Sequence, residues 1–280
     1  MKAARAEDGA RVRLEGFALH AGTVTSVTLE RWPGPLAFAF GDKRVPLGAL
    51  SVARTDLGVA VTDGEGATID LVEHLLAALG GLGIRRGVLM TVEGSELPLL
   101  DGGARAFADA LLTLAPERGR PELAVARRGH VEWRGSRYDF EVAPGGATRV
   151  DVHFEHPVIG AESASWQGDA ATFLAAIAPA RTFGFASQGE ELLRIGRAQL
   201  YASPDPRAAA ALGSVLVVDD AARGTLAAGE LARHKLLDLI GDFTLYGGPP
   251  EGHVEARRPG HTATHRIIGE ALAAGILSRR

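Results

Sequence analysis

Hydrophobic and polar residues alternate in short runs along the first third of the chain. This period of two is typical of half-buried β-strands, and it marks three segments: residues 11–19, 24–29 and 36–40. At residues 70–82 the apolar positions recur with the period of a helix, which we expect to end at Gly80 and Gly81. The rest of this part predicts a strand, a turn and an amphipathic helix, at residues 87–92, 98–103 and 104–114.

A polar segment with a proline at each end, residues 116–121, is the best candidate for a linker. After it the pattern restarts with three predicted strands, at residues 130–133, 137–142 and 149–154. Short helical segments follow at residues 170–178, 190–196 and 205–212, with a buried strand at 214–218. Longer helices are expected at residues 229–243 and 263–277. We therefore divide the sequence into a first unit, residues 1–119, and a second unit, residues 120–280.

The two units share an order of elements: strands come first, and a helix that carries a histidine follows. This helix contains His74 in the first unit and His234 in the second, each followed by a similar apolar sequence that ends in glycine. The similarity suggests a duplicated α+β fold in which two units pack face to face with these helices at the interface. Because binding clefts favour interfaces between units, we expect the functional site there.

The composition narrows the class of protein. A chain of 280 residues, of which 46% are hydrophobic, can fill one large core or two moderate ones. The net charge of -4 argues against a surface that follows phosphates, so we expect no nucleic-acid partner. The first eight residues lack the apolar core of a signal peptide, and no apolar run approaches the roughly 18 residues of a membrane-spanning helix. We expect a cytoplasmic protein, for which a transient contact with a membrane surface stays open.

A metal site can be assembled from residues of the two histidine-bearing helices. The chain has no Cys, so a metal ion must be held by His and carboxylate side chains. His234 and Asp238 are four residues apart and share one helical face, and His74 offers a third ligand. Three protein ligands leave one position for a water molecule, as hydrolysis requires. The alternative for His234 and Asp238 alone is an ion pair on the helix surface.

Three further residues could act on a substrate beside such a metal ion. Glu73 adjoins His74 and could accept a proton from water, unless it is an ordinary surface residue. Thr182 could donate a hydrogen bond to a developing oxyanion, unless its segment is a packed turn. His261 begins the last helix, where the helix dipole disfavours its charged form. A nearby carboxylate or an anionic substrate would restore that charge and let His261 act as a general acid. The alternative is a histidine of the first helical turn that has no role.

Two charged residues near His234 have more than one interpretation. Lys235 is either an ordinary solvated lysine or a contact for a phosphate. Asp242 comes directly after Gly241, where a carboxylate is more often a capping or loop residue. His265, one turn after His261, is expected to be structural.

Six segments together resemble a known enzyme family: Leu19–Gly22, Val72–Leu79, Leu97–Gly102, Ala180–Phe185, Arg233–Asp238 with Gly241–Asp242, and Gly260–His261. The order of these segments is similar to that in UDP-3-O-acyl-N-acetylglucosamine deacetylases, the zinc amidases at the committed step of lipid A synthesis. They span nearly the whole chain, and the second, fourth and fifth are specific as a set. The substrate implied by this resemblance is an acylated UDP-sugar, and we expect the enzyme to be a monomer.

The resemblance also implies a role for each candidate residue. The zinc ligands would be His74, His234 and Asp238. Glu73 would be the general base, Thr182 would donate to the oxyanion, and His261 would be the general acid or the cation beside the oxyanion. Substrate binding would involve Lys235, Phe183 and Asp242, with Lys235 near the diphosphate and Asp242 orienting His261. Iron(II) could replace zinc, because a set of two His and one Asp does not select between these ions.

The fold implied by the resemblance is a pair of two-layer α/β sandwich halves, each with a small insertion. The second insertion, around residues 190–218, would form the passage for the fatty acyl chain. This chain departs from the family in places, with Gly103 where the family usually has Ser and no glycine-rich, Asn-containing sequence at residues 203–216. Two alternatives therefore stand beside the deacetylase: a related amidase for another N-acetylated sugar nucleotide, and a binding protein without turnover.

Overall fold

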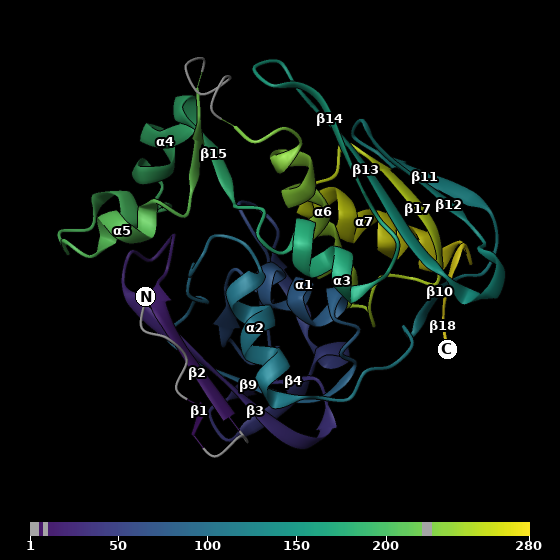
Figure 1. Cartoon of the computed structure of the whole chain (residues 1–280), viewed down its shortest axis with the longest axis horizontal. Helices are drawn as coiled ribbons and strands as arrows, with labels where there is room; N and C mark the ends of the chain where they lie inside the picture. Colours follow the sequence, from purple (N-terminus) through teal and green to yellow (C-terminus); the bar gives the residue numbers. More distant parts are fainter. Residues whose placement is uncertain (1–5, 8–10, 220–225) are drawn as a thin grey trace.

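The computed structural model describes residues 6–7, 11–219 and 226–280 of the chain. Two β-sheets form outer layers, and the main helices lie between them (Figure 1). The predicted α+β class is therefore confirmed. Most of the amino-terminal segment that we examined for a signal peptide lies outside the described residues. Within the part of the chain that the structure describes, no helix is long and apolar enough to cross a membrane.

The first sheet comes from the first unit, and its strand β2 alternates buried and exposed positions, whereas β3 and β9 have three consecutive buried residues. Its spatial order is β1 (Ala6–Glu7), β2 (Arg11–Phe17), β3 (Val24–Pro35), β9 (Arg86–Glu93), β4 (Ala37–Phe40) and β5 (Lys43–Pro46). β9 lies between two hairpins, antiparallel to β3 and parallel to β4. Helix α2 (Arg105–Leu114) packs on β2 and β3, and α1 (Glu73–Gly81) packs on α2.

The second sheet has a corresponding order. Its strands are β11 (Gly129–Trp133), β12 (Ser136–Glu141), β17 (Gly252–Arg257), β13 (Thr148–His156) and β14 (Gly160–Trp166). β17 again lies between two hairpins, antiparallel to β12 and parallel to β13. Helices α6 (Glu230–Thr244) and α7 (His261–Ala273) cover its inner face. The common strand order supports the predicted duplication, which itself, like the boundary at residue 119, stays a prediction.

Smaller elements extend both units. A three-stranded sheet, formed by β6 (Ser51–Arg54), β7 (Ala60–Thr62) and β8 (Thr68–Ile69), belongs to the first unit. In the second unit, α3 (Ala170–Thr172) leads into a π-helical turn (Phe173–Ile177). We call residues 183–218 the insertion; it contains β15 (Phe183–Phe185), α4 (Gly189–Arg194), α5 (Ala208–Leu212) and β16 (Leu216–Val218). Strand β10 (Leu123–Val125) pairs with β18 (Leu277–Arg279) near the carboxyl end.

Two predicted elements were wrong in part. The strand predicted as buried at residues 214–218 is β16, in which Val217 is exposed because, among the described residues, β16 pairs with β15 alone in a two-stranded ribbon. The helix predicted at 263–277 is α7, which begins earlier and ends at Ala273. Gly275 has a left-handed backbone (φ +65°), and Leu277 then pairs with β10 instead of continuing the helix. Several strands were missed, among them β14 and β17, although the alternation of buried and exposed positions in β17 was present in the sequence.

The two histidine-bearing helices meet at the centre of the molecule, as predicted. Every residue of α1 is buried. A Cβ added to Gly80 would lie 2.1 Å from Thr244 Oγ1, and one added to Gly241 would lie 2.2 Å from the Glu73 carbonyl oxygen. Glycine is therefore required at both positions for α1 and α6 to approach this closely. This close approach brings the functional side chains of the two units together.

Candidate metal centre and catalytic cavity

Three side chains from α1 and α6 form a compact group of potential metal ligands. His74 Nε2 lies 3.8 Å and His234 Nε2 lies 3.4 Å from Asp238 Oδ1. All three atoms lie within 4.8 Å of one another, and the described residues contain one such group. Ligands about 2 Å from a tetrahedral zinc ion lie roughly 3.3 Å apart. The separations are therefore close to those that a divalent ion requires.

Asp238 gives an independent indication that a cation belongs here. Its Oδ1 atom is buried and has no hydrogen-bond partner among the described residues, although buried carboxylate oxygens are nearly always paired. Its Oδ2 atom lies 2.9 Å from the Lys235 ammonium. Burial disfavours the charged carboxylate, but His234 and Lys235 hold the pKa of Asp238 well below its usual range. The orphaned oxygen fits a metal ligand.

The two histidines are in the protonation state that metal binding needs. Burial lowers the pKa of His74 to about 3, and it also lowers the pKa of His234, so both rings are neutral near pH 7. The Nδ1 of His234 lies 3.1 Å from the Ala180 carbonyl oxygen, to which it donates. That bond fixes the tautomer and leaves the Nε2 lone pair directed toward the group.

A carboxylate and a third histidine face each other beside this group. Glu73 is only 3% exposed, and its Oε2 accepts a hydrogen bond of 2.9 Å from the Val59 amide. Burial raises the pKa of Glu73 to about 7, which suits a general base near neutral pH. The Nε2 of His261 lies 4.0 Å from Glu73 Oε1 and 3.9 Å from Asp238 Oδ2. Glu73 is thus buried, and the surface alternative for it is wrong.

The Asp242 carboxylate contacts the Nδ1 side of the His261 ring. Its Nδ1 lies 3.0 Å from both carboxylate oxygens of Asp242. Burial alone would lower the pKa of His261, but Asp242 and Asp238 raise it to about 9. The carboxylates therefore outweigh the helix dipole, and His261 is charged at pH 7. Asp242 is buried inside α6, so the interpretation of a capping or loop residue was wrong.

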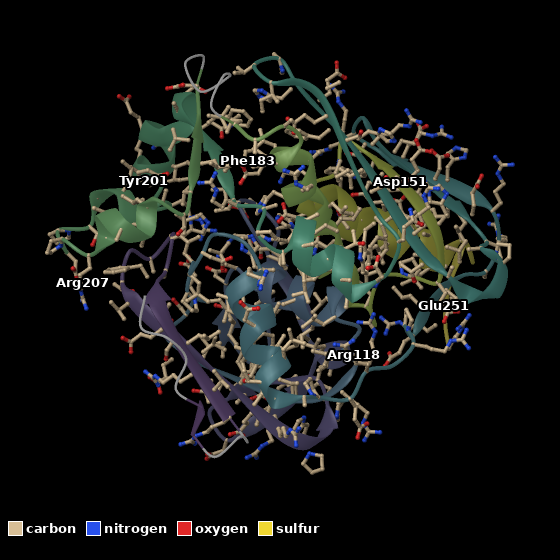
Figure 2. The ribbon with its side chains drawn as sticks, in the orientation of Figure 1. Arg118, Asp151, Phe183, Tyr201, Arg207 and Glu251 are labelled. Atoms are coloured by element: carbon tan, nitrogen blue, oxygen red, sulfur yellow. The ribbon has the colours of Figure 1, made fainter. Side chains whose placement is uncertain are left out.

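A cavity of about 460 Å³ opens over these groups and is lined by both units and by the insertion. Thr182 lines it directly before β15, and its amide donates 2.7 Å to the Gly102 carbonyl. The Phe183 ring lies 5.8 Å from the His234 ring, and the Lys235 ammonium lies 5.1 Å from the Phe183 ring. Figure 2 labels Phe183 on the insertion side of this region, with Tyr201 farther out on the same lobe.

The structure thus brings every predicted site residue to one cavity or directly behind it. Lys235 differs in one respect from the prediction, since its ammonium contacts the same carboxylate as the proposed metal site. His265 lies behind Asp242, with Nδ1 2.9 Å from the Tyr246 hydroxyl and Nε2 3.6 Å from Asp242 Oδ1.

Comparison with known proteins agrees with this arrangement. The sequence profile of the UDP-3-O-acyl N-acetylglycosamine deacetylase family matches residues 9–273. A protein named UDP-3-O-acyl-N-acetylglucosamine deacetylase from Myxococcus xanthus is 33% identical over 276 residues, covering 93% of this chain and 83% of the relative. Proteins of the same name from Syntrophotalea carbinolica and Brucella melitensis biotype 1 are each 32% identical. Their alignments cover 93% and 95% of this chain, and 85% and 93% of the relatives.

This chain belongs to the UDP-3-O-acyl N-acetylglycosamine deacetylase family. The resemblance inferred from six short segments is thereby confirmed. Enzymes named UDP-3-O-acyl-N-acetylglucosamine deacetylase are amide hydrolases. The His74, His234 and Asp238 group is compatible with the metal that such an enzyme uses, and either zinc or iron(II) matches its ligand types.

One residue of the cavity wall was missed. His20 lines the cavity and is buried, but the sequence interpretation assigned it no chemical role. Its presence in the segment Leu19–Gly22, the first of the six matching segments, was the available signal. The backbone amides of His20 and Ala21 donate 2.8 and 2.9 Å to the two carboxylate oxygens of Glu96. This long-range contact could not be read from the sequence.

Proposed function

We propose that this chain hydrolyses the N-acetyl group of UDP-3-O-acyl-N-acetylglucosamine, the committed step of lipid A biosynthesis. The products would be acetate and UDP-3-O-acyl-glucosamine. One observation carries the proposal: a single cavity contains the His74, His234 and Asp238 group, a buried Glu73 with a pKa near neutrality, and a charged His261. The names of the relatives supply the substrate.

The residues of the cavity divide the reaction between them. A bound divalent ion would be held by His74, His234 and Asp238. Such an ion lowers the pKa of a water molecule and polarises the substrate carbonyl. Glu73 accepts the proton of the attacking water as the new C–O bond forms. The Thr182 hydroxyl and the charged His261 stabilise the negative charge on the acetamide oxygen. When the C–N bond breaks, the amine takes up a proton from His261 and acetate leaves.

The surroundings of these groups explain why they suit this reaction. Asp242 keeps His261 charged until the proton is needed, because its carboxylate lies 3.0 Å from Nδ1. Val59 keeps Glu73 in place through its amide. Lys235 and Phe183 line the part of the cavity beside β15, where we place the nucleotide sugar. The cytoplasmic location, the monomeric state and zinc as the ion in the cell remain parts of the proposal.

An acetate-release assay on UDP-3-O-acyl-N-acetylglucosamine tests this function. The purified chain should bind about one equivalent of zinc or iron, and mass spectrometry should identify UDP-3-O-acyl-glucosamine as the product. Glu73→Ala should keep the metal and lose most of the rate, because its carboxylate is the base and not a ligand. Equal rates on UDP-N-acetylglucosamine without an acyl chain would favour a related amidase. Stoichiometric metal without any acetate release would contradict catalysis altogether.

A further inference from the structure

His20 has both ring nitrogens engaged, on two different parts of the molecule. Its Nε2 lies 2.8 Å from the Leu57 carbonyl oxygen, and its Nδ1 lies 3.2 Å from the Ala198 amide nitrogen. A carbonyl only accepts and an amide N–H only donates, so Nε2 carries the proton and Nδ1 accepts. Burial lowers the pKa of His20 to about 4, against a smaller opposing effect of the Leu57 carbonyl. The ring is therefore a neutral bridge near pH 7.

The Nε2 contact leads to the proposed base. Leu57 and Gly58 have positive φ angles of 59° and 125°, a conformation that is unfavourable for Leu. The next residue, Val59, donates its amide to Glu73 Oε2. A Cβ on Gly58 would lie 2.9 Å from Glu73 Oε1 and 2.4 Å from a methyl of Leu71. This loop is thus fitted closely around the Glu73 carboxylate, and His20 anchors its near end.

The Nδ1 contact leads to the insertion. Ala198 also has a positive φ, of 52°. The next two amides, of Gln199 and Leu200, donate 3.2 and 3.1 Å to the carbonyls of His20 and Leu19. A Cβ on Gly22 would lie 2.8 Å from the Gln199 carbonyl carbon. Residues 197–200 therefore lie directly along the segment that contains His20.

An ion pair next to this contact strengthens the attachment. A guanidinium nitrogen of Arg197 lies 3.5 Å from the Asp70 carboxylate, which also pairs with Arg54 of strand β6. Ala198, Leu192 and Tyr201 of the insertion line the cavity. The attachment at residues 197–200 thus decides where one wall of the cavity stands.

The backbone at His20 is itself fixed by hydrogen bonds. The Glu96 carboxylate binds the amides of His20 and Ala21, and the Thr25 hydroxyl donates 2.8 Å to the Glu96 carbonyl. Both Glu96 and His20 are buried. The ring therefore has a fixed base from which its two nitrogens reach the Leu57 loop and the insertion.

We propose, on the basis of the function proposed above, that His20 is a positioning residue that joins the insertion to the proposed base Glu73. Its Nε2–H holds the loop that orients the Glu73 carboxylate, and so supports turnover. Its Nδ1 holds the cavity wall formed by the insertion, and so supports binding of the acylated substrate. The two effects belong to different atoms of one ring and can be separated.

Two conservative variants separate them. The side-chain amide of Asn reaches the position of Nδ1, and that of Gln reaches the position of Nε2. His20→Asn keeps an acceptor for Ala198 and loses the donor to Leu57, so kcat should fall about ten-fold with KM changed less than about two-fold. His20→Gln keeps the donor and loses the acceptor, so KM should rise about ten-fold with kcat changed less than about two-fold.

Amide hydrogen exchange gives a readout that does not need turnover. Exchange of a peptide covering residues 195–202 should accelerate about ten-fold or more in His20→Gln and stay near the parent rate in His20→Asn. His130→Asn and His130→Gln, at an exposed histidine of β11, are the matched controls and should leave exchange and kinetics unchanged.

The outcomes distinguish the two proposals. If the parent chain releases no acetate, the proposed function fails, and the exchange experiment still tests the attachment through Nδ1. If the parent is active but both variants change kcat, KM and exchange alike, His20 is only a packing residue and the inference is overturned. If instead His20→Asn raises KM and His20→Gln lowers kcat, the assignment of the ring nitrogens is wrong and the inference is likewise overturned.

Discussion

The helix pair α1 and α6 and the insertion form different walls of one cavity, and they are held in place in different ways. Both helices are packed so closely that two glycines leave no room for a methyl group. The insertion, in contrast, exposes four large apolar side chains: Leu193, Ile195, Tyr201 and Val217. In Figure 1 its helices α4 and α5 lie at one side of the molecule, and the insertion meets the first sheet through α5, whose Ala208 packs in a small cluster with Phe17 of β2.

This difference corresponds to what each wall has to do. Metal ligands and a general base must keep their relative positions within about half an ångström. A wall that receives a substrate chain can move at lower cost, because few buried contacts are lost when it opens. In the proposed function, the chemistry would depend on the rigid interface between the units, and substrate binding would depend on the insertion, which is attached at a few points.

The largest expected effect comes from breaking the rigid wall at a ligand. His74→Ala should lose the bound metal and reduce acetate release by about 10³-fold or more, because the ion lowers the pKa of its water by several units. Metal analysis and the acetate-release assay measure both effects. His130→Ala, at an exposed position on β11, is the control and should retain metal and rate. A metal-replete, active His74→Ala enzyme would refute the ligand assignment.

A methyl group between the helices tests their close approach. In Gly241→Ala the new Cβ would start 2.2 Å from the Glu73 carbonyl oxygen, so α1 and α6 must separate. We expect a loss of about 3 kcal/mol in the free energy of unfolding, together with weaker metal binding. Gly269→Ala in α7, whose Cβ would meet nothing within 4 Å, should be neutral or slightly stabilising. Equal denaturation midpoints for the two variants would show that the contact is not required.

The same type of change at Gly22, a residue of the first unit that contacts the insertion, should have a milder effect. In Gly22→Ala, the positive φ of 68° and the contact with Gln199 should displace residues 197–200. We expect KM for the acylated substrate to rise several-fold, with a smaller loss of stability than in Gly241→Ala. Gly189→Ala in α4 adds a Cβ in open space and is the control. A Gly22→Ala variant that loses metal before its KM changes would contradict the separation of the two walls.

The smallest effect concerns pH. The pKa of His20 is lowered from 6.5 to about 4 in the folded chain, so the unfolded chain takes up the proton first as pH falls. The contribution of His20 to stability is present above about pH 6.5 and is lost toward pH 4. From pH 7 to pH 5.5 this amounts to about 1 kcal/mol. Denaturant unfolding at both pH values should show a drop smaller by this amount in His20→Gln; an identical drop would contradict it.

Local patterns in the sequence predicted the α-helices and several of the longer strands, because the period of burial is set by the geometry of each element, but they missed β14, β17 and most of the short strands. They failed where pairing with a distant strand decided where an element ends or which of its residues are exposed. The end of α7 depends on the pairing of Leu277 with β10, and the exposure of Val217 depends on the single neighbour of β16. Neither partner is close in sequence, so no local window could have contained the information.

The site residues were likewise predicted where local spacing was enough and missed where the contacts come from distant segments. A spacing of four residues predicted that His234 and Asp238 share a face, and the recurrence of a histidine-bearing helix added His74. The role of His20 was missed because its partners, Leu57 and Ala198, come from two distant segments. From its local sequence Asp242 suggested a capping or loop residue, and only the resemblance pointed to its partner His261, because that contact joins α6 to α7.

By itself the sequence determined the order of the helices and strands that it predicted and the chemical groups available to the site. These groups are the His, Asp and Glu residues that a metal-dependent amidase needs, in a chain without Cys. Only the tertiary structure decided their states. Burial brings the pKa of Glu73 near neutrality, while Asp242 and Asp238 keep His261 charged against both burial and the helix dipole. These states depend on desolvation and on charges a few ångströms away, which exist only after the two units have packed together.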